Sequence, residues 1–112
     1  MTATVQPALD GSVPEPAKTR TQQRIEDYET WVEIVRPTFV EIARTGQPFL
    51  FWKVARDHEL PDPPDRDHDW GRFAASLHKD GVTRVDGFGH TRDKSAVRRW
   101  RGTVAAMQGR AA

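Results

Sequence analysis

The chain has 112 residues, no cysteine and a formal net charge of +1 at pH 7. The length fits one domain, and the lack of cysteine excludes disulfide bonds, cysteine zinc ligands and thiol catalysis. No apolar run approaches the roughly 18 residues that a membrane helix needs. Residues 1–20 have neither the basic start nor the apolar block of a secretory signal. We therefore expect a cytoplasmic protein with no membrane partner.

The small net charge conceals two segments of opposite sign. Residues 57–69 hold six carboxylates and one arginine, whereas residues 81–112 hold seven lysines or arginines and two aspartates. The first segment has a charge of −5 and the second a charge of +5. Such a basic segment can bind a polyanion, although it also fits an ordinary solvated surface.

Residues 1–20 are predicted to form a disordered arm, because three prolines interrupt them and few apolar residues are present. A long first helix follows. Thr19 and Gln22 match the S/T-x-x-E/Q capping box that marks a helix start. Pro37 is expected to kink or split the helix, and Gly46 to end it. Its apolar residues recur at steps of three and four: Ile25, Tyr28, Val32, Val35, Phe39 and Ile42.

A short extended link at residues 47–49 separates the first helix from a second helix, predicted at residues 50–58. The segment LPDPPDRD at residues 60–67 contains three prolines and is predicted to be a loop. A third helix is predicted to begin near Asp67 or Asp69, either of which can act as N-cap, and to end at Gly81. Its apolar face comprises Trp70, Phe73, Ala74 and Leu77, and its polar face comprises His68, Asp69, Arg72, Ser76 and Lys79.

Two strands are predicted at residues 82–88 and 95–101, joined by a polar loop. In the second strand, Trp100 and the arginines at positions 99 and 101 alternate, so they face opposite sides. Trp100 and Phe88 are expected to anchor this hairpin. Residues 103–112 are small and polar, and they are predicted to form a flexible tail.

Enzymatic motifs are not evident. His58, His68 and His78 recur every ten residues among carboxylates, but no pair has the spacing of a helical zinc motif. The chain has no phosphate-binding glycine loop and no nucleophile motif. We therefore expect no enzyme activity, metal, cofactor or small-molecule substrate. A nuclease that uses the cluster at Asp67, His68 and Asp69 is the remaining catalytic alternative.

The order of helix, link, helix, loop, helix and hairpin is that of a winged helix-turn-helix. The span 46–102 resembles winged-helix DNA-binding domains, and it is similar to small proteins encoded by actinobacterial phages and prophages. The residues that carry the resemblance are GQPF, WGRFAASLHKDGV, VDGFG and VRRWRG. It implies an α+β fold at residues 21–102, with three helices and a C-terminal hairpin wing.

The resemblance also implies how duplex DNA would be bound. The third helix would enter the major groove, with its core face packed on the first helix and on Trp52. The hairpin tip would contact the neighbouring backbone or the minor groove, and the arginines of the return strand would contact phosphates. The implied DNA-binding residues are His68, Arg72, Ser76, Lys79, His90, Arg92, Lys94, Arg99 and Arg101.

The acidic segment leaves a second function open. Carboxylates at the start of the third helix repel phosphates, although they also favour the positive end of that helix. The alternative is an adaptor that binds another protein through the acidic loop and the long first helix. The first helix is also a candidate homodimer surface.

Overall fold

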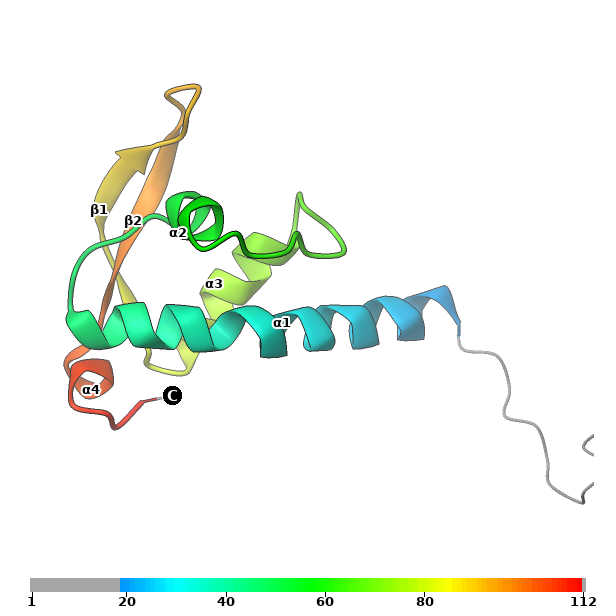
Figure 1. The fold of residues 1–112 in the computed structure, drawn as a ribbon, viewed down its shortest axis with the longest axis horizontal. Helices are drawn as coiled ribbons and strands as arrows, with labels where there is room; N and C mark the ends of the chain where they lie inside the picture. The colour runs from blue at the N-terminus through cyan, green and yellow to red at the C-terminus, as the bar shows by residue number, and fades with distance from the viewer. Residues whose placement is uncertain (1–18, 112) are drawn as a thin grey trace, which may run out of the picture.

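The computed structural model describes residues 19–111. Within these residues, four helices and a two-stranded antiparallel sheet form an α+β fold (Figure 1). The predicted arm lies outside the described residues, apart from Thr19 and Arg20. The elements in chain order are α1 (Arg20–Thr45), α2 (Phe51–Asp57), α3 (Asp69–Lys79), β1 (Thr83–His90), β2 (Ala96–Gly102) and α4 (Val104–Met107).

Local sequence signals fix both ends of α1. The Thr19 hydroxyl accepts from the Gln22 N–H at 3.0 Å, and the Gln22 side chain accepts from the Thr19 N–H at 3.1 Å, which completes the capping box. Gly46 ends the helix in the left-handed conformation, with φ of 73°. The helix does not split at Pro37, because the fully buried Val35 and Phe39 hold the turns on either side against the core.

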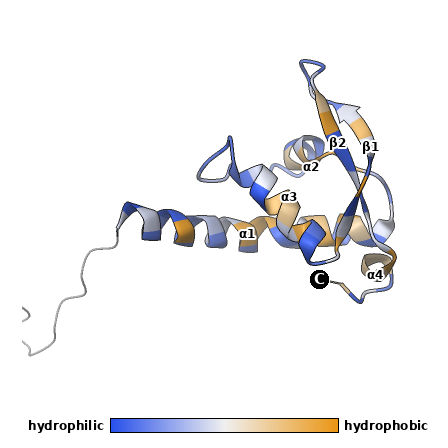
Figure 2. Ribbon diagram, turned by 180° about the vertical axis from the view of Figure 1, so that it is seen from behind, coloured by the Kyte–Doolittle hydropathy of each residue, from blue (hydrophilic) through white to orange (hydrophobic). Residues whose placement is uncertain are grey.

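The buried face of α1 differs in part from the predicted stripe. Ile25 is 43% exposed, whereas Trp31 and Ala43, which the stripe omitted, are buried. Figure 2 shows hydrophobic residues gathered on the half of α1 that lies beside α3 and the hairpin. Residues 20–27 are all exposed, so the buried face of α1 begins at Tyr28.

An aromatic cluster joins the three longer helices to the core. The ring of Phe39 lies 4.8 Å from that of Phe51 and 5.3 Å from that of Phe73, and Trp31 meets Trp70 edge-on at 4.8 Å. Such pairs contribute about 0.5–1.5 kcal/mol each beyond their buried area. Trp52, which was expected in this packing, instead donates its indole N–H to the His90 carbonyl at 3.2 Å.

The extended link joins the hairpin as a bridged segment. The Phe49 N–H donates to the Trp100 carbonyl at 2.7 Å, and the Trp100 N–H donates to the Phe49 carbonyl at 2.9 Å. Trp100 is buried, as expected of a hairpin anchor. Phe88 is 67% exposed, so its predicted role as a second anchor is wrong. An irregularity in β1 between Val85 and Phe88 shifts the register there, and Phe88 pairs with Arg98 beyond the edge of the core.

The C-terminal residues, predicted to be a flexible tail, are part of the fold. The Thr103 hydroxyl donates to the Gly81 carbonyl at 2.6 Å and accepts from the Ala106 N–H at 3.0 Å, which caps α4. Ala106 is fully buried and Ala111 is 9% exposed. These contacts correct the predicted boundary at residue 102, because the packed domain continues to Ala111.

Candidate nucleic-acid interface

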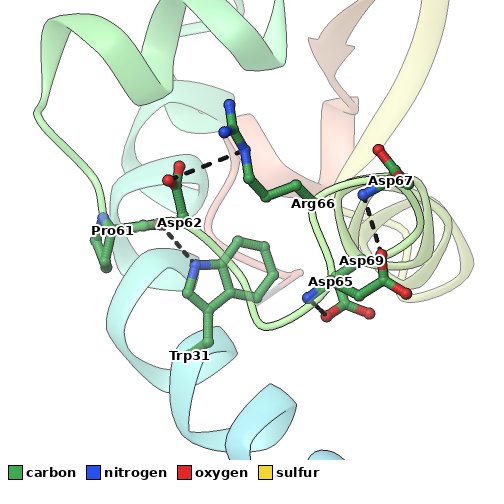
Figure 3. Close-up of polar contacts among 7 residues, drawn as sticks. All are labelled: Trp31, Pro61, Asp62, Asp65, Arg66, Asp67 and Asp69. Atoms are coloured by element: carbon green, nitrogen blue, oxygen red, sulfur yellow. Dashed lines mark hydrogen bonds and ion pairs between the residues drawn. The ribbon is translucent and has the colours of Figure 1, made fainter.

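The acidic loop is folded back on itself before α3. The Trp31 indole N–H donates to the Pro61 carbonyl at 2.8 Å, which ties the loop to α1 (Figure 3). Asp69 is buried, and its carboxylate accepts from the Asp65 N–H at 2.9 Å. The N-cap position is occupied by His68, which makes no side-chain cap bond within the described chain. The prediction that Asp67 or Asp69 caps α3 is therefore wrong, because Asp69 is already the first helical residue.

His68 and Asp65 form an exposed ion pair at the start of α3. The His68 Nδ1 lies 2.9 Å from an Asp65 carboxylate oxygen. This hydrogen bond raises the pKa of the His68 imidazole above its ordinary 6.5 and lowers that of the Asp65 carboxyl below its ordinary 3.8, and the charge attraction acts in the same direction. His68, a predicted DNA contact, therefore already has one partner in the chain.

Fewer side chains of α3 are free to contact DNA than the sequence predicted. The Arg72 guanidinium lies 3.9 Å from the centre of the Tyr28 ring, so this predicted DNA contact stacks on α1. Ser76 is half-buried and donates its hydroxyl to the Phe73 carbonyl at 2.7 Å, which turns it away from the outermost position. Lys79 is exposed, as expected.

Small residues occupy the most outward positions of α3. Gly71 and Ala75 are both exposed, and they lie one turn apart on the side opposite the buried Phe73 and Leu77. His78 is exposed next to them, and its Nδ1 lies 3.1 Å from the Thr83 carbonyl, which accepts from it. None of these three positions is among the predicted DNA contacts, although a helical projection centred on Phe73 and Leu77 places them on the outward side.

The hairpin tip is an ordered turn that carries two exposed cations, Arg92 and Lys94. The Asp93 carboxylate accepts from the Thr91 hydroxyl and from the Ser95 N–H. These bonds, the hydroxyl contact first, lower the pKa of the Asp93 carboxyl. One carboxylate therefore stays ionised between the two cations.

His90 lies at the end of β1, next to the tip. Its side chain is exposed, and its backbone carbonyl accepts the Trp52 indole N–H. The sequence did not predict this bond, which fixes the backbone of His90 to α2.

Arg99 and Arg101 are held by Asp86 and are half-buried. The Arg99 Nε donates to the Asp86 carbonyl at 2.7 Å, and the Arg101 Nε lies 3.4 Å from the Asp86 carboxylate without hydrogen-bond geometry. The irregularity in β1 brings Asp86 beside both guanidinium groups. Their predicted role as freely available phosphate contacts therefore needs correction.

Two other arginines of the hairpin are better placed for an external anion. Arg84 and Arg98 are exposed, and within the described residues their side chains make no ion pair or hydrogen bond. Arg84 pairs with Arg101 across the hairpin, and Arg98 pairs with Phe88. Since β2 runs regularly between residues 98 and 101, the two arginines lie on opposite faces of the sheet.

Neither a metal site nor a membrane helix is found in the described part of the chain. No group of three or more histidine or carboxylate side chains among residues 19–111 is arranged to hold a metal ion. None of the helices described there has the length and apolar character to cross a membrane.

No protein-family model, curated protein or solved structure matches the chain.

Proposed function

We propose that this chain is a winged-helix protein that binds duplex DNA, with α3 in the major groove and the β1–β2 hairpin as the wing. The bridge between Phe49 and Trp100 carries this proposal, because it joins the link before α2 to the second strand of the hairpin. Helix, bridged link, two helices and hairpin is the chain order of a winged helix. The support therefore comes from how the elements are connected and not from residue composition alone.

The outward face of α3 suits close approach to a groove. An α-helix fits the major groove, which is about 12 Å wide. Gly71 and Ala75 keep the helix backbone close to its surface, and Lys79 stands at the end of this face as a hydrogen-bond donor. Arg72 can take part if it leaves the Tyr28 ring on binding.

The hairpin supplies charge for the phosphates. It has six arginines or lysines and two aspartates between residues 83 and 102. Asp86 neutralises part of the charge of Arg99 and Arg101. The cations left for DNA are Arg84, Arg92, Lys94 and Arg98. Contacts of this kind supply affinity and salt dependence, whereas base contacts from α3 supply sequence choice.

The cellular role follows from the DNA-binding proposal and from the resemblance of residues 46–102. We place the protein in the cytoplasm as a regulator, or as a replication or recombination accessory, of a phage or another mobile element. A homodimer through α1 fits this role, since Ile34 on this helix is 56% exposed. Dimers of DNA-binding proteins read two half-sites at a fixed spacing.

A second candidate is a protein-binding adaptor that uses the start of α1. The observation that favours it is the exposure of residues 20–27, the first turns of α1, none of which is buried. The acidic loop contributes less than the sequence suggested, because Asp65 and Asp69 are engaged within the loop.

Selection of bound sequences from a random duplex pool tests the first proposal. The wild-type chain is expected to enrich a motif whose half-site spacing also reports dimerisation. Lys79→Ala is expected to relax one position of that motif, because its contact is made from α3. Arg92→Ala is the matched control, since it is expected to lower the yield without altering the motif. A pool that remains random after selection with the wild-type chain would favour the adaptor.

A further inference from the structure

A groove of about 750 Å³ lies between α2, the start of α3, the acidic loop and β2. Its aromatic lining comes from three residues, Phe51, Trp52 and Trp70. All three are half-buried, and the Arg56 guanidinium lies over the Trp52 ring, 5.1 Å from its centre. The groove is thus a largely apolar hollow at the junction of α3 and the hairpin, the two elements proposed to meet DNA.

The aromatic lining is held in place by contacts outside the groove. The Trp52 indole N–H is bonded to the His90 carbonyl, and the Trp70 ring packs edge-on against Trp31 at 4.8 Å. The ring of Phe51 lies 4.8 Å from that of Phe39 in a stacked arrangement. The rings are therefore positioned before any ligand arrives, which lowers the entropic cost of binding a flat group.

Three arginines line the groove, and they differ in availability. Arg56 is paired with Asp57 at 2.9 Å, and Arg66 lies 3.9 Å from Asp62. Arg98 is exposed and makes no side-chain ion pair or hydrogen bond with any described residue.

Two carboxylates, those of Glu59 and Asp62, also line the groove, and both belong to the loop side. Arg98 comes from β2, on the hairpin side. Its unpaired charge gives that side a preference for an anion, and a ligand with one anionic end and one flat apolar end is complementary to the groove.

Gly71 borders the groove, and the packing of the fold does not account for it. A Cβ at this position would meet nothing within 4 Å, and the residue has an ordinary helical backbone. Glycine inside a helix is less favourable than alanine by about 0.5–1 kcal/mol. A bare backbone at the edge of the groove allows close approach of a ligand from outside.

We propose that this groove binds one unpaired nucleotide of a DNA strand, with its base against the Trp52 and Trp70 rings and its phosphate at Arg98. The inference rests on the proposed DNA-binding function and extends it to a strand end or an opened base pair. Base–aromatic stacking tolerates any sequence, because every base has a flat face. The groove would therefore add affinity for unpaired DNA without adding sequence choice.

The test uses the full chain and three fluorescent probes: a short oligothymidylate, an abasic strand of equal length and a duplex. The wild-type chain is expected to bind the oligothymidylate about tenfold more tightly than the abasic strand, since stacking of one base accounts for an effect of this size. Trp52→Leu is expected to remove that difference. Arg98→Ala is expected to weaken binding of both single strands.

Arg24→Ala is the control, because it removes an exposed arginine from the start of α1, outside the hairpin and the groove. It is expected to leave the binding of all three probes unchanged. Thermal unfolding of each variant checks the fold. If Trp52→Leu is unstable, Trp52→Phe replaces it in the test. This variant keeps a stacking ring and is expected to retain most of the difference in affinity between the oligothymidylate and the abasic strand.

Equal binding of the two single strands by the wild-type chain would overturn the inference, and so would a difference that survives Trp52→Leu. If the duplex binds and the two single strands bind with equal affinity, the groove proposal fails and the DNA-binding proposal stands. If none of the probes binds, the DNA-binding function fails with it. Binding of an acidic, tryptophan-containing peptide in a way that Trp52→Leu abolishes, without binding of oligothymidylate, would assign the groove to a protein partner.

Discussion

At the scale of single residues, two glycines occupy opposite environments. A Cβ on Gly102 would lie 1.8 Å from the Ala43 carbonyl oxygen, so β2 crosses α1 at a point where only a hydrogen fits. A Cβ on Gly71 would meet nothing within 4 Å. The first glycine is required by the fold, whereas the second is left for a role at the surface.

Gly102→Ala is expected to lower the free energy of unfolding by about 3 kcal/mol, because backbone atoms of α1 and β2 must move apart to admit the methyl group. Urea denaturation followed by circular dichroism measures this change. An unaltered midpoint would show that the close approach of β2 to α1 is wrong.

Gly71→Ala is expected to raise the free energy of unfolding by about 0.5–1 kcal/mol, because the helix gains a better helix former and the methyl group meets no neighbour. The same denaturation experiment applies, so the two variants control for each other. A loss of stability in this variant would mean that Gly71 is packed more tightly than described.

At the scale of elements, the start of α3 depends on charge. The His68–Asp65 contact is an ion pair only while the imidazole is protonated and the carboxyl is ionised. The raised pKa of His68 makes its contribution complete below the unfolded pKa and lost as the pH rises through the folded pKa. The lowered pKa of Asp65 makes its contribution present above the unfolded pKa and lost as the pH falls through the folded pKa. The ion pair therefore stabilises this end of α3 most in weak acid, and its contribution falls at higher and at lower pH.

An NMR titration of the histidine ring protons tests this arrangement. His68 is expected to titrate above 6.5, and Asp65→Asn is expected to lower its pKa, since the amide removes the negative partner and keeps the shape. Identical titration of His68 in the wild type and in Asp65→Asn would contradict the ion pair.

The cap of α4 gives a second test at this scale. Thr103→Val is expected to lower the free energy of unfolding by about 1–2 kcal/mol, because the hydroxyl no longer accepts from the Ala106 N–H. Thr30→Val, at an exposed position within α1, is the matched control, and its effect is expected to stay within about 0.5 kcal/mol. If the two variants behave alike, residues 103–111 are not packed as described.

Element positions could be predicted where the signal is local. The capping box at Thr19, the left-handed Gly46 and the proline-rich loop each act through neighbouring residues, and all three are found. Helix α4 could not be predicted, because Ala106 is too small to mark a buried face and is buried only by contacts with distant elements.

The candidate site could be predicted less well than the helices. The irregularity between Val85 and Phe88 decides which hairpin side chains face the core, and its local signal is a single residue, Gly87, whose φ is 83°. It leaves Phe88 exposed and engages Arg99 and Arg101 with Asp86. The exposure of Lys79, Arg92 and Lys94 does not depend on this irregularity, and it is found as predicted.

At the scale of the whole molecule, charge is separated along the fold. The acidic loop is tied to α1 through Trp31, whereas the basic hairpin projects from the opposite side of α2 (Figure 1). Several carboxylates of the loop are engaged by His68, Arg66 or the loop backbone, whereas Arg84 and Arg98 of the hairpin make no side-chain ion pair or hydrogen bond with any described residue. A polyanion would therefore be drawn to the hairpin first and to α3 next.

The salt dependence of duplex affinity tests this account most directly. The logarithm of the association constant is expected to fall steeply and linearly with the logarithm of salt concentration, and Arg92→Ala is expected to reduce that slope by about one. Thr30→Val, far from the hairpin, is expected to leave the slope unchanged. Duplex affinity that is independent of salt, or an unchanged slope in Arg92→Ala, would contradict the assignment of the hairpin as the phosphate-binding wing.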